Sequence, residues 1–353
     1  MRYVKELDAL RGIAILFVII THWAPPGLFK RDFHFGEWGV FIFFVLSGYL
    51  ITHILFSNIN KGKSTKEIII SFYIRRTLRI FPIYYLAIGV LWLCKSVVGK
   101  EVQEGLPWFL TYTQNIYYFI NQNLAGPLSP YWTLAVEEQF YLIWPWIIVM
   151  AGSKRSLVAI IIFLLVGFSC FYIIPAKPFI TILTPFTFFS FGLGGLLAWL
   201  QLFQYQSLVK FLKSIQIIGL LSVVLFFLGV FKNNQFILPI NILISITAFA
   251  LIAYLLIKKD KLPPYLAFVF TNKFLIFTGK ISYGIYLYHN LIPQLLNSKL
   301  VNIYFNPLLP DFLYKHHWGL LYLVENVLLL YGIAWLSYWF IEKRFLALKE
   351  KFS

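Results

Sequence analysis

The chain has 353 residues, of which 60% are hydrophobic and 12% are charged, whereas about 25% of the residues of a soluble domain are charged. This composition excludes a soluble enzyme, a disordered chain and, with only two cysteines, a disulfide-stapled secreted scaffold. The net charge of +16 comes from basic residues scattered between apolar segments, so it indicates membrane topology rather than a nucleic-acid partner.

Ten apolar segments approach the length of about 20 helical residues that crosses a bilayer core. They lie at residues 10–25, 37–56, 78–97, 131–151, 155–174, 182–200, 214–231, 236–257, 281–298 and 319–341. We therefore expect an all-α membrane protein, a polytopic bundle of about ten transmembrane helices in a single domain over residues 1–353. The stretch 107–120 is expected to form an interfacial helix rather than a span.

The distribution of Lys and Arg predicts the orientation of these spans. When the N-terminus is placed in the cytoplasm, the inner segments and inner helix ends contain 22 of the 30 Lys and Arg residues. Positive side chains are enriched on the cytoplasmic side of a membrane. The sequence therefore predicts that both termini are cytoplasmic.

The first span carries two ionisable groups, Arg11 and His22. At about 100° per residue, eleven steps bring the second side chain to within about 20° of the first, roughly 16.5 Å further along the helix. Ionisable residues at membrane depth are costly and therefore mark candidate functional sites. The alternative is an arginine that snorkels to the surface and a histidine with a structural hydrogen bond.

Two further motifs follow in the second and third spans. Arg76 and Arg79 are three residues apart and share a helix face. A guanidinium group binds phosphate through a bidentate fork, which favours a phosphate site over simple anchoring to anionic lipid. Ser47 and Gly48 permit close helix approach, and ordinary membrane packing is the favoured interpretation of that pair.

The fourth span contains adjacent carboxylates, Glu137 and Glu138, about two turns into an apolar helix. Thr133, Glu137 and Tyr141 form one polar stripe at spacings of four, and Glu138 lies about 100° away. Packing alone does not explain two carboxylates at this depth, and at least one of them is expected to have a raised pKa or a cationic partner.

The predicted ninth span also carries polar side chains at helical spacing. Ser282, Tyr286 and His289 follow a spacing of four and then three residues, so a continuous helix would place them on one face. The sequence contains no cysteine–histidine cluster with metal-ligand spacing, and we expect no metal.

Taken in order, these segments resemble the acyltransferase-3 family of integral-membrane O-acyltransferases. They are 7–12 (LDALRG), the Arg11 and His22 pair, 43–48 (FFVLSG), the Arg76 and Arg79 pair, 132–141 (WTLAVEEQFY) and 282–289 (SYGIYLYH). Six motifs in the same order, over nearly the whole chain, make the resemblance specific.

The resemblance implies an enzyme that transfers an acyl group, usually acetyl, from a cytoplasmic acyl-CoA co-substrate to a hydroxyl. The expected acceptor is a cell-surface or lipid-linked saccharide, such as lipopolysaccharide O-antigen or exopolysaccharide, with a small molecule as the alternative. The resemblance also implies a location in the bacterial inner membrane and no permanently bound cofactor, and it leaves a homo-oligomer open. Some relatives carry a C-terminal extracytoplasmic domain, which we do not expect here because the chain stops at Ser353.

The motifs also suggest how such an enzyme would work. Arg11, Arg76 and Arg79 would hold the phosphates of CoA, and the pantetheine arm would run along the face shared by Arg11 and His22. His22 would act as general base on the acceptor hydroxyl, with Glu137 orienting it, and an acyl-histidine on His22 is the competing mechanism. Supporting roles at the substrate or oxyanion are expected of Ser47, Glu138, Tyr141, Ser282 and His289.

Two other classes of protein compete with this interpretation. A transporter or flippase for a lipid-linked sugar would also carry polar groups at membrane depth, but it should show inverted repeats, which the sequence lacks. A sensor or scaffold has no need for a cation aligned with a buried histidine and paired carboxylates.

Overall fold

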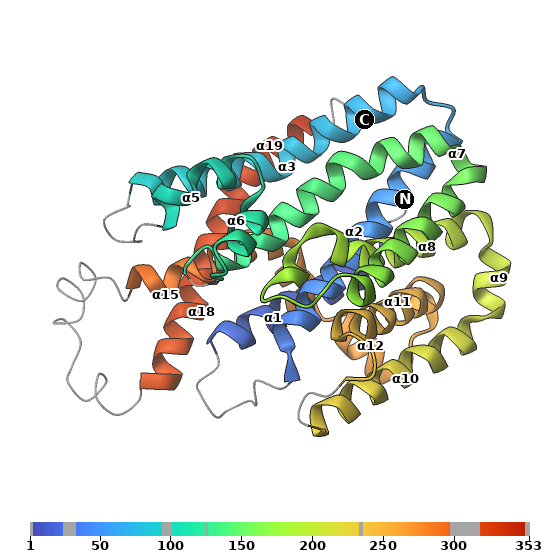
Figure 1. Ribbon diagram of the computed structural model, residues 1–353. Coiled ribbons are helices and arrows are strands. Elements are labelled where there is room, and N and C mark those ends of the chain that lie inside the picture. Colours follow the sequence, from blue (N-terminus) through green and yellow to red (C-terminus); the bar gives the residue numbers. More distant parts are fainter. Residues whose placement is uncertain are drawn as a thin grey trace. The chain divides into compact units, whose positions relative to one another are not determined.

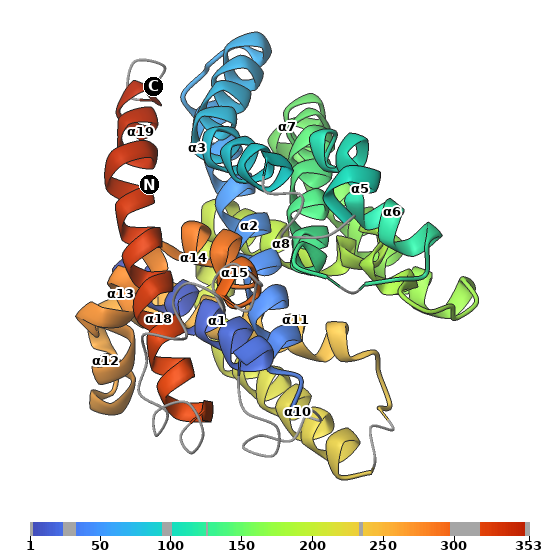
Figure 2. The same cartoon turned by 90° about the vertical axis from the view of Figure 1, so that its left-hand side faces the viewer.

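The computed structural model describes residues 3–23, 33–93, 101–124, 126–232, 236–296 and 318–349. These residues form helices joined by short turns, and none of the described residues lies in a strand (Figures 1 and 2). The long helices are α1 Lys5–Trp23, α2 Phe35–Asn60, α3 Thr65–Leu93, α7 Trp132–Ile173, α8 Phe188–Phe203, α10 Leu212–Phe231, α11 Ile240–Lys258 and α18 Trp318–Ser337.

Shorter helices connect or extend the long ones. They are α5 Glu101–Leu110, α6 Gln114–Ile120, α9 Tyr205–Lys210, α12 Pro264–Phe270, α13 Lys273–Lys280, α14 Ser282–Tyr288, α15 Leu291–Leu296 and α19 Lys343–Lys349. Single turns of 3₁₀-helix are η2 Ser129–Tyr131, η3 Ile180–Ile182, η4 Thr184–Thr187 and η5 Lys259–Lys261, and a π-helical turn, η7 Tyr338–Glu342, continues α18.

Eight helices of the described part are long and apolar enough to cross a membrane, which confirms the predicted polytopic helical bundle. Helix α7 supplies two of them, because Gly152, with φ of 63°, breaks its helical path at the boundary predicted from the sequence. Many apolar side chains point outward, among them Met150 and Phe231, each 77% exposed. Outward apolar side chains are what lipid contact requires. Helix α1 has four charged residues among its first seven and is not one of the eight.

Three predicted boundaries are wrong. The predicted span 281–298 is interrupted, since α14 ends at Tyr288 and α15 begins at Leu291. The inner segment expected before the third span is largely helical, because α3 begins at Thr65. The predicted interfacial helix over 107–120 is two helices, α5 and α6. Apolar composition marks these stretches as helical but does not locate their ends.

The contacts divide the chain into two compact units. The first contains Met1–Thr21, Lys30–Ile70 and Val136–Lys280, and the second contains His22–Phe29, Ser71–Ala135 and Ile281–Ser353. Helices α1, α3 and α7 contribute residues to both units.

In the first unit, α2 packs along α8, and α11 packs against α2, α8 and α10 (Figures 1 and 2). Gly48 and Gly194 allow the contact between α2 and α8. A Cβ atom at Gly48 would collide with the carbonyl oxygen of Phe191, and one at Gly194 would collide with that of Val45. Small residues at such crossings let backbones approach closely, which stabilises helix pairs in lipid.

In the second unit, tyrosine hydroxyls connect the elements. Tyr84 of α3 donates a hydrogen bond to the carbonyl of Phe109 (2.8 Å), and its ring stacks on Tyr112 with centroids 4.3 Å apart. Tyr131 is fully buried and donates to the carbonyl of Leu287 (2.7 Å), which ties η2 to α14. These bonds satisfy backbone carbonyls that no water reaches.

Candidate functional site

The second unit brings two histidine rings together. His22 occupies the last turn of α1, and its ring centroid lies 5.0 Å from that of His289, with the planes inclined by 59°. The two side chains differ in environment, because His22 is exposed and His289 is completely buried. The structure therefore pairs the predicted catalytic residue with one of the predicted supporting residues.

The break between α14 and α15 explains how His289 is held. Pro293 has no N–H group, and in a continuous helix its ring would clash with the carbonyl of residue 289, which disfavours one unbroken helix through this segment. The carbonyl of His289 instead accepts a hydrogen bond from Trp23 Nε1 (2.9 Å). Asn290 donates to the carbonyls of Gly126 (3.1 Å) and Pro127 (3.0 Å), which anchors the turn.

The backbone next to this break also determines which ring nitrogen of His289 carries a proton. Its Nδ1 lies 2.6 Å from the carbonyl oxygen of Tyr286. A carbonyl only accepts hydrogen bonds, so Nδ1 carries the proton and Nε2 of the neutral ring presents a lone pair. This Nε2 has no hydrogen-bond partner among the residues that the structure describes.

Hydroxyl groups surround the helical turn before His289. Tyr286 donates to the carbonyl of Pro130 (2.6 Å), and its oxygen lies 2.6 Å from the hydroxyl of Thr133. Ser282 is buried, and its Oγ has no hydrogen-bond partner within the described part of the chain. Ser282 and Tyr286 thus lie on the helix that leads directly to His289.

The first unit contains a separate cluster of hydroxyl and carboxylate groups, contributed by α2 and α7. Ser47 donates to Oε1 of Glu137 (2.9 Å), and the hydroxyl of Tyr141 donates to Ser47 Oγ (3.1 Å). Ser47 and Glu137 are half-buried, as is the adjacent Glu138. The hydrogen bonds hold one carboxylate oxygen of Glu137 in a fixed orientation.

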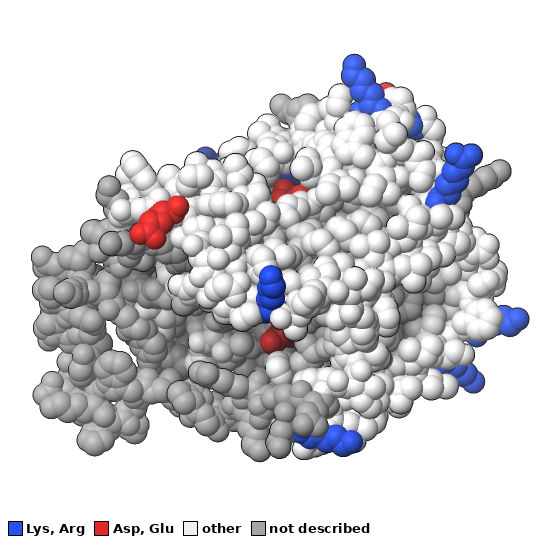
Figure 3. Space-filling view, in the orientation of Figure 1, with Lys and Arg blue, Asp and Glu red and all other residues white. Residues whose placement is uncertain are grey.

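The predicted cations lie on different elements. Arg11 Nη1 is 3.9 Å from Oδ1 of Asp8, one turn earlier on α1. Arg76 lies 5.8 Å from the ring of Phe72, and Arg76 and Arg79 are both half-buried on α3. On the face drawn in Figure 3, the Lys and Arg side chains of the described residues stand apart from one another on a mostly uncharged surface.

Two of the predicted groupings stay predictions. Glu137 belongs to the first unit and His22 to the second, and Arg11 likewise belongs to a different unit from Arg76 and Arg79. The structure does bring Ser47 of α2 to Glu137 and Tyr141, two residues of the polar stripe predicted on the fourth span.

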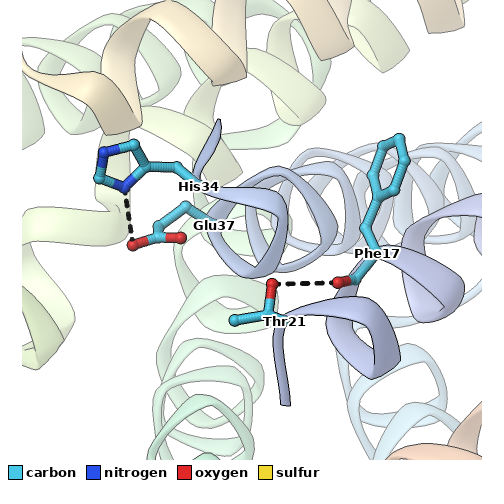
Figure 4. A network of polar contacts seen from close by, with 4 residues as sticks. All are labelled: Phe17, Thr21, His34 and Glu37. Atoms are coloured by element: carbon cyan, nitrogen blue, oxygen red, sulfur yellow. Dashed lines mark hydrogen bonds and ion pairs between the residues drawn. The ribbon is translucent and has the colours of Figure 1, made fainter. Parts of the chain in front are cut away.

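Sequence reasoning missed a polar pair at the start of α2. His34 Nδ1 lies 3.2 Å from Oε1 of Glu37, and Thr21 donates to the carbonyl of Phe17 (3.2 Å) (Figure 4). The three-residue spacing of His34 and Glu37 was the available signal. Among the described residues, no group of three or more His, Cys, Asp or Glu side chains is arranged to hold a metal ion.

A family model described as an acyltransferase domain matches residues 4–342. The chain belongs to the acyltransferase-3 family. This assignment confirms the resemblance seen in the six sequence motifs, and the chain is a multi-pass membrane protein of that family.

The chain is similar to several proteins that are named as O-acetyltransferases. It is 31% identical over 318 residues to the peptidoglycan O-acetyltransferase OatA of Listeria monocytogenes, covering 82% of this chain and 49% of the relative. It is 36% identical over 185 residues to the putative peptidoglycan O-acetyltransferase YrhL of Bacillus subtilis, covering 47% of this chain and 27% of the relative.

A third relative is the putative O-acetyltransferase SACOL0978 of Staphylococcus aureus, 30% identical over 331 residues, with 86% of this chain and 52% of the relative covered. The chain therefore spans about half the length of these relatives, or less. No solved structure matches it.

Proposed function

We propose that this protein is a membrane O-acetyltransferase that transfers an acetyl group from acetyl-CoA to a hydroxyl of a cell-surface glycan. The observation that carries the proposal is the placement of His22 beside the buried ring of His289, at the end of a helix that begins with the Arg11 motif. Membership of the acyltransferase-3 family and the names of the relatives support the same activity.

In the proposed reaction, His22 is the general base. Its neutral imidazole takes the proton of the acceptor hydroxyl as the hydroxyl oxygen attacks the thioester carbonyl. The tetrahedral intermediate then expels the CoA thiolate, which receives that proton from the imidazolium. The competing mechanism begins with attack of His22 on the thioester, releases CoA, and transfers acetyl from the ring nitrogen to the acceptor in a second step.

The proposed donor site uses guanidinium groups on α3. CoA is a polyanion, and Arg76 and Arg79 lie three residues apart on the same helix, where both can contact phosphate. Arg76→Lys keeps the charge but removes the planar fork, so we expect the KM for acetyl-CoA to rise about tenfold with a smaller change in kcat. Arg155→Lys, at an exposed arginine, is the matched control, and an unchanged KM in Arg76→Lys would remove Arg76 from the donor site.

The proposed acceptor is a glycan, with peptidoglycan as the first candidate. The names of two relatives support peptidoglycan, and O-antigen and exopolysaccharide are the alternatives suggested by the family. Deleting the chain in its own host and measuring ester-linked acetate on each purified glycan identifies the acceptor directly.

The decisive experiment uses the protein reconstituted in vesicles with acetyl-CoA and glycan fragments. We expect release of CoA thiol that depends on the acceptor, and loss of that release in His22→Ala. His34→Asn is the matched control, because Asn tolerates the left-handed backbone that His34 adopts (φ 49°). Both variants must extract from membranes and elute as the wild type does.

The outcomes separate the competing interpretations. Full activity in His22→Ala would overturn the assignment of the base. No acceptor-dependent thiol release by the wild type, together with movement of a lipid-linked sugar across the vesicle membrane, would overturn the enzyme and favour a flippase.

A further inference from the structure

One buried ring nitrogen of the second unit, Nε2 of His289, has no role in the mechanism described so far. His289 is completely buried, its Nδ1 proton is bonded to the Tyr286 carbonyl, and its Nε2 lone pair has no partner among the described residues. Buried polar atoms are nearly always hydrogen-bonded, and each exception calls for an explanation. The His22 ring, with its centroid 5.0 Å away, is the neighbouring group that can supply an N–H donor.

We propose that His289 is a positioning residue for His22. Its Nε2 accepts a hydrogen bond from one ring nitrogen of His22, which leaves the other ring nitrogen of His22 with the lone pair that faces the acceptor hydroxyl. This inference rests on the proposed function, because it states how the base in that reaction is prepared.

The arrangement forms a chain of three groups, each of which fixes the next. The Tyr286 carbonyl can only accept, so the His289 ring must donate from Nδ1 and accept at Nε2. An acceptor at that point selects the His22 tautomer that carries its proton on the facing nitrogen. When His22 takes the substrate proton, the positive ring is stabilised by the lone pair of His289, and His289 keeps its own proton throughout.

A purely structural role for the imidazole is less able to explain these contacts. The turn is held by the backbone carbonyl of His289, which accepts from Trp23, and by the side chain of Asn290. Neither bond uses the imidazole ring. A ring nitrogen that is buried, oriented and unused is therefore better explained by His22 than by the stability of the turn.

The test compares two substitutions that divide the functions of the ring. In His289→Asn, the side-chain amide lies where Nδ1 was, so it can still donate to the Tyr286 carbonyl but offers no acceptor at the position of Nε2. In His289→Gln, the longer side chain can place its oxygen at the position of Nε2. We expect kcat to fall at least about tenfold in His289→Asn, with the KM for acetyl-CoA unchanged, and His289→Gln to retain most of the activity.

A second measurement does not depend on acetyl transfer. Diethyl pyrocarbonate modifies the unprotonated nitrogen of histidine, and peptide mass spectrometry reports the rate at each site. At pH 8 we expect the modification of His22 to slow several-fold in His289→Asn relative to the wild type and His289→Gln, because His22 loses the acceptor that orients its lone pair. His34 serves as the internal reference.

The two readouts distinguish the failure of each idea. Equal rates of His22 modification in all three proteins, or equal activity in both variants, would overturn the positioning role. A slowed modification in a protein that never transfers acetyl would leave the histidine pair intact while refuting the enzymatic function.

Discussion

The hydroxyl–carboxylate cluster of α2 and α7 and the histidine pair formed by α1 and the turn after α14 are built in different ways. Ser47, Glu137 and Tyr141 are joined by hydrogen bonds between side chains. His289 is held through backbone carbonyls, its own and that of Tyr286. A side chain can be removed by a single substitution, whereas a backbone carbonyl remains whatever residue carries it. Conservative substitutions of the residues that bond Glu137 should therefore lower activity. Conservative substitutions of the residues whose backbone holds His289 should leave activity largely unchanged.

Of the substitutions that test this comparison, Glu137→Gln is expected to have the largest effect, because it replaces the carboxyl group on which the first cluster is built. If the carboxylate supports acetyl transfer, kcat should fall by about 100-fold or more. Acceptor-dependent thiol release in vesicles measures the loss, and Glu104→Gln, at an exposed glutamate on α5, is the control. Wild-type turnover in Glu137→Gln would remove this cluster from the reaction.

Ser47→Ala should have the next largest effect. It deletes the donor to Glu137 and the acceptor for Tyr141 at once. A typical hydrogen bond contributes about 0.5–1.5 kcal/mol, so we expect up to roughly a tenfold loss of kcat. Ser47→Thr, which restores a hydroxyl, should recover part of it. Similar activity in the two variants would show that the hydroxyl does not orient the carboxylate.

Tyr286→Phe should have the smallest effect on activity. Tyr286 is hydrogen-bonded to His289 as Ser47 is to Glu137, but through its backbone carbonyl. The substitution keeps the carbonyl that binds Nδ1 of His289 and removes only the hydroxyl bonded to Pro130 and Thr133. We expect turnover within about twofold of the wild type and a stability loss of about 1–2 kcal/mol. A thermal unfolding curve in detergent measures the second quantity. A large fall in kcat at unchanged stability would contradict the inference that the backbone carbonyl of Tyr286, and not its hydroxyl, orients His289.

Much of the fold follows from the sequence because membrane spans depend on local apolar length. Each of the eight spans overlaps an apolar segment that predicted it, and the separation of the two halves of α7 coincides with Gly152. The interruption at His289 and Asn290 escaped prediction because apolar residues continue the segment on both sides of this polar pair. The available signal was Pro293, whose ring disfavours a helical carbonyl four residues earlier, although Pro82 and Pro145 lie inside α3 and α7.

The candidate site was predictable as a set of residues but not as a set of contacts. Helical spacing related Ser282, Tyr286 and His289 because they are close in the sequence, although His289 lies just beyond the end of α14. The bond from Ser47 to Glu137 joins residues 90 positions apart, and the pairing of His22 with His289 joins the end of α1 to the turn that follows α14. Such contacts depend on how helices pack, which periodicity does not specify.

The glycine contact between α2 and α8 limits how this protein can be re-engineered. Ser47 is the immediate neighbour of Gly48, and any side chain at Gly48 or Gly194 would push against the backbone of the opposite helix. A directed-evolution library that randomises these two codons would consist mostly of misassembled variants. Diversity introduced to broaden acceptor range belongs elsewhere, with this pair of codons kept invariant.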